Sequence, residues 1–195
     1  MSFEKIMNRI IKRISNIFLS VMVFTLISPF SSNCQDKGAQ VNQSLKKNKE
    51  GVSYIQTNPG LAIKLFKEAQ VLDPKNPDYP NNIGVVLLSQ GKFKDAIPYF
   101  VRATEIDSKY VRGFYNEGVC LQNLLKNEEA IKAYNKALKL TEVPEAYFNL
   151  GIVHTRLNQN EKAIEAYQKF INVAPATMAE PISDAKAKIK ALSKN

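Results

Sequence analysis

The sequence is poor in the residues that most often carry catalysis or bind metals. It has one histidine, His154, and two cysteines, Cys34 and Cys120. A metal site built from several histidines is therefore excluded, and the two cysteines do not make a disulfide framework. The cysteines and the histidine are not spaced for nucleophilic chemistry, and no glycine-rich phosphate loop is present. We predict a protein that is not an enzyme and that has no cofactor and no metal.

What the sequence does contain is an internal repeat. Three glycines are each followed twelve residues later by an alanine, and four residues after that by an aromatic residue. These sets are Gly84, Ala96 and Phe100; Gly118, Ala130 and Tyr134; and Gly151, Ala163 and Tyr167. Counting back by 34 residues from the first set reaches Ala62 and Phe66, but Glu50 in place of a glycine. An earlier copy with a diverged front half is therefore indicated, and such repeats are typical of stacked architectures.

Apolar residues within each copy recur with the period of a helix, as at Ala130, Tyr134 and Ala137. Short polar stretches at 89–93, 124–128 and 157–161 suit tight turns. Pro77 and Pro144 fit the first turn of a helix, where the missing N–H costs least. Each copy is therefore predicted to form two helices joined by a tight turn.

These spacings resemble the signature of the tetratricopeptide repeat, which has small residues at positions 8, 20 and 27 and an aromatic residue at position 24. The resemblance implies an all-α fold, a right-handed α-solenoid of stacked helix-turn-helix units that bury their apolar faces against each other. About four units are expected in residues 43–177: a degenerate unit at 43–76, then units at 77–110, 111–143 and 144–177. Phe170 departs from the pattern, because it replaces the alanine at position 27.

Residues 178–195 follow the last unit and have an amphipathic pattern. Ile182, Ala185, Ile189 and Leu192 fall on one stripe of a helix, and lysines fall on another. The last unit of a stack needs a helix with one polar face to cover its apolar side. We predict that this segment is a capping helix.

The first 33 residues follow a different pattern. A stretch with four basic residues, Lys5, Arg9, Lys12 and Arg13, precedes an apolar run at 17–27. A basic stretch, an apolar core too short for a membrane-spanning helix and an exit of small residues are typical of a secretory signal peptide. Residues 1–33 are therefore predicted to be a signal peptide.

Cys34 stands directly after this segment and begins a polar stretch at 34–42. The arrangement resembles a bacterial lipoprotein signal of the spirochaete type, although Ser31 and Asn33 depart from the usual motif. The resemblance implies that Cys34 carries lipid, that residues 34–42 form a polar tether, and that the protein is exported and anchored to a bacterial membrane. A plain cleaved signal and an uncleaved anchor are the alternatives.

In tetratricopeptide repeat proteins the first helices of the units line a concave groove. Carried onto this sequence, the groove positions are Asp78, Asn81, Val85, Leu88 and Ser89; Arg112, Tyr115, Val119, Gln122 and Asn123; and Glu145, Phe148, Ile152, Thr155 and Arg156. Tyr115 and Phe148 hold equivalent places, and exposed aromatic residues of this kind anchor a peptide or a helix. The alternative is that both rings pack between neighbouring first helices.

Some members of this family grip a C-terminal carboxylate with lysine and arginine beside a recurring asparagine. Here asparagine recurs at Asn82, Asn116 and Asn149, where its usual role in the family is structural. Glu145 and Asn149 stand where the basic pair of the last unit would be. This clamp is therefore not predicted.

The net charge is +9 at pH 7. Lysines gather at 46–49 and 186–194, which is compatible with anionic lipid, with acidic partners or with an ordinary solvated surface. Basic and aromatic residues are not interleaved as in proteins that stack nucleic acid bases, so no nucleic acid partner is predicted.

The resemblances together predict a binding module at the cell envelope that holds a peptide or helix of another envelope protein and assists its assembly or stability. Alternatives are a small-ligand receptor, an accessory subunit of an enzyme, and a structural protein that associates with itself. A deep pocket with converging polar groups would favour the small-ligand receptor, and an open groove would count against it.

Overall fold

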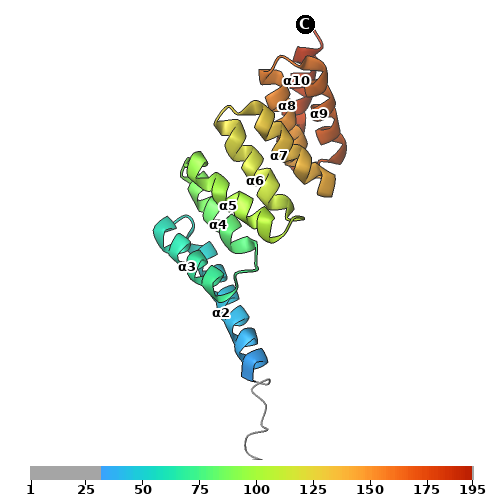
Figure 1. Ribbon diagram of the computed structural model, residues 1–195. Coiled ribbons are helices and arrows are strands. Elements are labelled where there is room, and N and C mark those ends of the chain that lie inside the picture. Colours follow the sequence, from blue (N-terminus) through green and yellow to red (C-terminus); the bar gives the residue numbers. More distant parts are fainter. Residues whose placement is uncertain (1–31, 195) are drawn as a thin grey trace, which may run out of the picture. The chain divides into compact units, whose positions relative to one another are not determined.

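The computed structural model describes residues 32–194, with side chains from Lys37 onward. Every regular element in this range is helical (Figure 1). The helices are α2 (Ser32–Tyr54), α3 (Pro59–Leu72), α4 (Asp78–Ser89), α5 (Phe93–Ile106), α6 (Val111–Asn123), α7 (Asn127–Leu140), α8 (Pro144–Arg156), α9 (Asn160–Val173), a short 3-10 helix η1 (Ala176–Met178) and α10 (Ala179–Leu192). The predicted all-α class is confirmed.

Contacts divide the chain into two units, Met1–Asn42 and Gln43–Asn195, which are described separately. In the first unit, the described residues belong to α2, and the side chains of residues 37–42 are exposed. No helix within residues 32–194 is both long and apolar enough to cross a membrane. The predicted signal peptide lies outside the described residues except for Ser32 and Asn33, and the side chain of Cys34 lies outside them too.

In the second unit, the helices pack in the order of the chain. Helix α4 packs on α5, α6 on α7 and α8 on α9, and each second helix then packs on the first helix of the next pair. Helix α10 packs on α9, where a further first helix would follow. Figure 1 shows this succession from α3 to α10. The predicted stack of helix-turn-helix units is confirmed.

The repeated glycine and aromatic residues meet where the two helices of a unit cross. A Cβ atom added to Gly84 would lie 2.6 Å from the Phe100 ring, and one added to Gly118 would lie 2.6 Å from the Tyr134 ring. Contacts under 3.0 Å essentially never occur at a real Cβ atom. The repeated spacing therefore encodes a close helix crossing that leaves no room for a side chain.

The first copy has the same contact between a glycine and an aromatic ring. Its glycine is not the residue reached by counting back 34 positions. A Cβ atom at Gly51 would lie 2.7 Å from the Phe66 ring. The sequence placed Glu50 at this position, but the structure uses Gly51, fifteen residues before Phe66 instead of sixteen. Helix α2 ends three residues after Gly51, whereas α4 ends five residues after Gly84, so the turn of the first copy differs in length.

The turns inside the three later units interrupt the helices at 90–92, 124–126 and 157–159, as predicted. Each turn contains one residue with positive φ: Gly91 at 72°, Leu125 at 59° and Asn158 at 56°. Glycine and asparagine adopt this conformation readily, whereas it costs other residues about 1–2 kcal/mol. Leu125 therefore adds strain to the turn between α6 and α7, and its side chain is 69% exposed.

Helix α10 covers the apolar side of the last unit. Ala185 is buried against Tyr167 and Phe170 of α9, and Ile182, Ile189 and Leu192 pack around them. Lys186, Lys190 and Lys194 remain exposed. The predicted stripes are thus the two faces of the helix.

Candidate functional site

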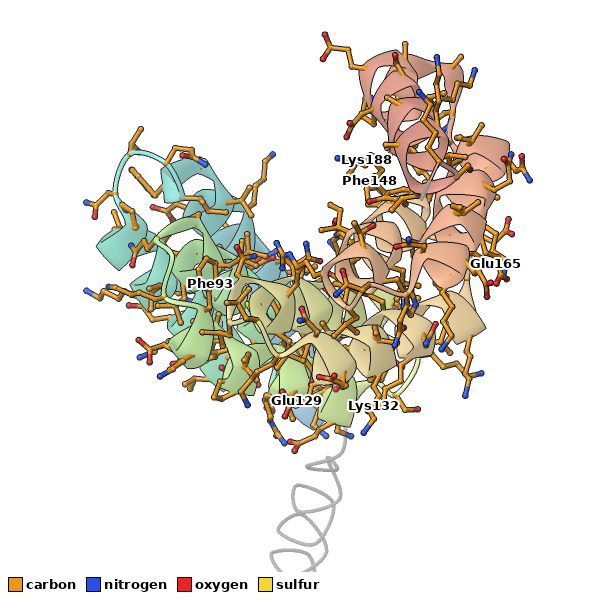
Figure 2. All side chains as sticks on the ribbon, turned by 90° about the horizontal axis from the view of Figure 1, so that it is seen from above. Phe93, Glu129, Lys132, Phe148, Glu165 and Lys188 are labelled. Atoms are coloured by element: carbon orange, nitrogen blue, oxygen red, sulfur yellow. The ribbon has the colours of Figure 1, made fainter. Side chains whose placement is uncertain are left out.

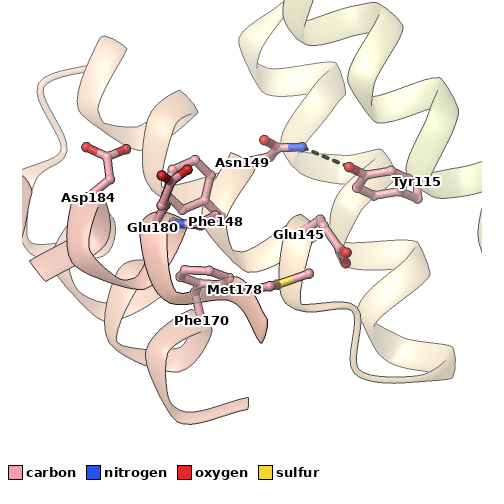
Figure 3. A pocket seen from close by; sticks show the side chains of 9 residues that line it. Tyr115, Glu145, Phe148, Asn149, Phe170, Met178, Glu180 and Asp184 are labelled. Carbon is pink, nitrogen blue, oxygen red and sulfur yellow. Dashed lines mark hydrogen bonds between the residues drawn. The ribbon is translucent and has the colours of Figure 1, made fainter. Parts of the chain in front are cut away.

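Two hollows follow one another along the space between α8 and α10. The larger has a volume of about 420 Å³ (Figure 3). We call it the aromatic pocket, and its lining residues are Tyr115, Glu145, Phe148, Asn149, Phe170, Met178, Glu180, Pro181 and Asp184. Because α6, α8 and α10 all contribute, the pocket depends on the stacking of the last two units and the final helix. Tyr115 and Phe148, the two predicted anchors, are brought to the same pocket.

Both anchors are held by other aromatic rings. The Phe148 ring lies edge-on to Tyr167, at 5.7 Å between centroids, and to Phe170, at 5.1 Å. The Tyr115 ring lies 5.9 Å from that of Tyr134. Edge and tilted pairs at these distances stabilise ring positions beyond burial alone. Tyr115 and Phe148 therefore pack mainly on the second helices of their own units, and both remain only partly buried.

The rim of the aromatic pocket is acidic. Glu145 lies in the first turn of α8, whereas Glu180 and Asp184 lie in the first two turns of α10. The pKa of the Tyr115 phenol is raised by burial and further by the negative charge of Glu145. The phenol therefore stays protonated at neutral pH, and its oxygen accepts a hydrogen bond of 3.4 Å from the Asn149 amide.

The second hollow has a volume of about 230 Å³ and a different charge. We call it the basic hollow, and its lining residues are Ile152, Thr155, Arg156, Tyr167, Lys188, Ala191 and Leu192. Arg156 donates a hydrogen bond of 3.0 Å to the backbone oxygen of Gln122, 34 residues earlier. Figure 2 shows Phe148 and Lys188 on the side of the stack turned away from Glu165 and Lys132.

Most of the predicted groove residues of α4 make contacts within the stack. Asn81 is only 2% exposed, and its side-chain oxygen accepts a hydrogen bond of 3.0 Å from Asn116. Asn82 likewise donates to Asn48, at 2.9 Å. These amides link the first helices of successive units, so Asn81 is structural here and offers no surface to a partner. Val85 and Leu88 pack against the cluster around Phe100, and Ser89 is exposed.

The predicted residues of α6 are also tied to neighbouring groups. Arg112 forms an ion pair with Asp78 of the preceding unit. The Gln122 side chain accepts a hydrogen bond of 2.7 Å from the Tyr134 hydroxyl. Val119 packs against the core between α6 and α8, and the exposed Asn123 bonds to its own helix. The predicted residues that line the hollows are thus Tyr115, Glu145, Phe148, Ile152, Thr155 and Arg156.

Six of the nine residues that line the aromatic pocket were not predicted as groove residues. Met178, Glu180 and Asp184 come from the segment at the start of α10, which was predicted only as a cap. One signal was available at Phe170, which replaces an alanine of the repeat pattern. Its large ring is 1% exposed and forms the wall between Phe148 and the cap.

The single histidine and the buried cysteine of the repeat region lie outside both hollows. His154 Nδ1 lies 2.7 Å from the Gln159 side-chain oxygen. Cys120 is buried, and burial together with the charge of Glu117 raises the pKa of its thiol to about 12. Among the described residues, no group of three or more histidine, cysteine, aspartate and glutamate side chains could hold a metal ion.

Comparison with known proteins matches the repeat region. A model of the tetratricopeptide repeat matches residues 56–111 and 115–179. DnaJ homolog subfamily C member 7 of Homo sapiens is 26% identical over 105 residues, which are 54% of this chain and 21% of that protein. Human serine/threonine-protein phosphatase 5 is 30% identical over 79 residues, which are 40% of this chain and 16% of the phosphatase. The chain thus spans about a fifth or less of these relatives.

Solved structures show the same fold. The Pseudomonas aeruginosa pilF structure has a TM-score of 0.67 and 23% identity, covering 78% of this chain and 71% of that one. The first repeat domain of Spaghetti (RPAP3), bound to the HSP90 peptide SRMEEVD, has a TM-score of 0.58 and 26% identity. That match covers 60% of this chain and 95% of the Spaghetti domain.

Proposed function

The chain belongs to the tetratricopeptide repeat family, and from this premise we propose that it is a non-catalytic interaction module that binds a peptide or helix of another envelope protein. The binding surface is the pair of hollows along α8 and α10. The observation that carries the proposal is the aromatic pocket, where Tyr115 and Phe148 are fixed by neighbouring rings yet partly exposed. Rigid, partly exposed aromatic residues are the usual anchors of protein interfaces.

The extent of the surface favours a segment of polypeptide over a small ligand. The lining residues of α8 run from Glu145 to Arg156, and these twelve residues of helix rise about 16 Å over eleven steps. An extended or helical segment laid along α8 contacts both hollows. A small ligand would instead need one enclosed cavity in which polar groups converge.

The Spaghetti domain is similar to this chain and was solved with an acidic HSP90 peptide. The last unit of the present chain has Glu145 and Asn149 on its first helix, and Glu145 belongs to the acidic rim. A ligand with the charge of that peptide would be repelled there. We therefore propose a different type of segment for this surface.

Replacing both Tyr115 and Phe148 with alanine is expected to weaken partner binding by about 2 kcal/mol or more, which is the usual threshold for a hot spot. The test compares partner captured from membrane extract by the wild type and by the double variant, with crosslinking and mass spectrometry as the readout. Circular dichroism and thermal melting establish that the variant is folded.

Lys132→Ala is the control for this comparison, because Lys132 lies on α7 and points away from Phe148 (Figure 2). Its replacement should leave capture unchanged. Undiminished capture by a folded Tyr115→Ala, Phe148→Ala variant would show that partners bind elsewhere on the stack.

The proposal includes a lipid tether at Cys34, which rests on the sequence alone. The basic stretch, the apolar run at 17–27 and the cysteine that follows are the parts of a bacterial lipoprotein signal. One acyl chain binds a membrane only marginally, so lasting attachment needs the several chains of a lipoprotein. The interaction module would then work at a membrane surface of the cell envelope.

Cys34→Ser is expected to move the protein from the detergent phase to the aqueous phase, or to leave its signal peptide uncleaved. Detergent partitioning and intact-mass measurement distinguish these results from the lipid-bearing wild type. Cys120→Ser is the matched control, because Cys120 is buried in the repeat core and should not affect partitioning. Recovery of the wild type in the aqueous phase would remove the tether from the proposal.

A further inference from the structure

The aromatic pocket has a charge opposite to that of the chain. The whole sequence has a net charge of +9. The pocket, in contrast, is lined by Glu145, Glu180 and Asp184, and by no lysine, arginine or histidine. Figure 3 shows Glu145 on one side of the pocket and the two carboxylates of α10 on the other, with the Phe148 and Phe170 rings near α10 and the Tyr115 ring beyond Glu145.

Within the described part of the chain, two of these carboxylates have no partner of opposite charge. Asp184 pairs with Lys188 at 3.4 Å. Among the described residues, neither Glu145 nor Glu180 forms an ion pair, and both side chains are exposed. A cation brought to the pocket would therefore meet two carboxylates without displacing an existing partner.

The floor of the pocket complements the stem of a long basic side chain. Phe148 and Met178 form an apolar surface over the buried ring of Phe170, and the Tyr115 ring extends it towards α6. Lysine and arginine bury their aliphatic stems on such surfaces and keep the charged head at the polar rim. Their heads are also attracted to the faces of aromatic rings.

We propose that the occupant of the aromatic pocket is a basic segment of the partner protein, in which a lysine or arginine side chain lies on the rings and reaches the carboxylates, with an apolar residue beside it. This inference rests on the proposed function and specifies the partner of the same surface. The basic hollow limits the charge of the segment, since Arg156 and Lys188 would repel further cations there. The residues that lie over the basic hollow are neutral or acidic.

Selection from a random library of twelve-residue peptides tests this inference directly, with the wild-type protein and its Tyr115→Ala, Phe148→Ala variant as separate baits. The expected result is enrichment, on the wild type only, of peptides with a lysine or arginine next to an apolar residue. Wild-type enrichment of peptides with acidic or uncharged residues at this place would overturn the inference and leave the proposed function standing. No difference between the two baits would overturn both.

A charge variant then locates the cation. Glu145→Gln, Glu180→Gln should bind the selected peptides about tenfold more weakly, because the variant removes both exposed charge pairs with the cation. The matched control is Glu128→Gln, Glu161→Gln, which removes two exposed carboxylates from the first turns of α7 and α9, outside the aromatic pocket. The affinity of this control variant for the selected peptides should change less than twofold.

Fluorescence anisotropy with labelled peptides measures the affinity of the wild type and of both variants at low and at high salt. Raising the salt concentration should weaken binding to the wild type, and should weaken binding to the pocket variant less. Equal weakening in both variants would attribute the effect to net charge and overturn the inference. If free arginine amide competes for the pocket with an affinity equal to that of the peptides, the pocket is a site for small cations, and the inference is overturned as well.

Discussion

Replacing Tyr134 with alanine is expected to lower the free energy of unfolding by about 3–5 kcal/mol. The Tyr134 ring is fully buried in the cluster that joins α6, α7 and α8. Its removal leaves a cavity at the helix crossing and takes away the hydrogen bond to Gln122. Tyr115 also loses the ring on which it packs, at 5.9 Å. Urea denaturation followed by circular dichroism measures the loss.

Leu140→Ala is the control for Tyr134→Ala. Leu140 lies at the end of the same helix and is 40% exposed, so its replacement should change stability by about 0.5 kcal/mol or less. Equal losses in the two variants would mean that the position-24 aromatic residues do not form the core. The alignment of the repeats would then be wrong.

The helices could be predicted closely because their signals are local. Turn residues at 89–93 and prolines such as Pro144 mark helix ends within the sequence itself. Gly51 was missed for the opposite reason. A fixed spacing of 34 assumes that every turn has the same length. The turn after α2, at 55–58, differs in length from the turn after α4, at 90–92. The close approach of Gly51 to Phe66 depends on that turn, and no local pattern reports it.

Six of the sixteen residues that line the two hollows were predicted as groove residues. Tyr115 and Phe148 were found because family positions assign the inner face of each first helix, and that face follows from helical periodicity. Glu180 and Asp184 were not found, since the cap has no family position and its docking depends on the apolar stripe that covers α9. The prediction that Asn81 lines the groove was wrong, because its amide forms a hydrogen bond with Asn116 in the next unit, a contact between residues far apart in sequence.

Gly118→Leu is expected to destabilise the fold by about 3 kcal/mol, at the upper end of the usual cost of overpacking. A Cβ atom at Gly118 would already lie 2.6 Å from one atom of the Tyr134 ring and 2.7 Å from another. The ring is fully buried and cannot move aside without shifting α7 against α6. Helix propensity acts in the opposite direction, because leucine favours a helix more than glycine does. A measured loss therefore reports the crossing itself.

Gly38→Leu separates the two effects of this substitution. Gly38 lies inside α2, and no described atom lies within 4 Å of an added Cβ, so leucine there should be neutral or stabilising by a few tenths of a kcal/mol. The double variant Gly118→Leu, Tyr134→Ala gives the decisive measurement, because the new side chain can occupy the space that the ring vacates. Its destabilisation should fall short of the sum of the two single effects by about 0.5–3 kcal/mol, the range expected for residues in contact. Strict additivity would show that Gly118 and Tyr134 do not oppose each other at the crossing, and the physical reason given for the repeated spacing would have to be abandoned.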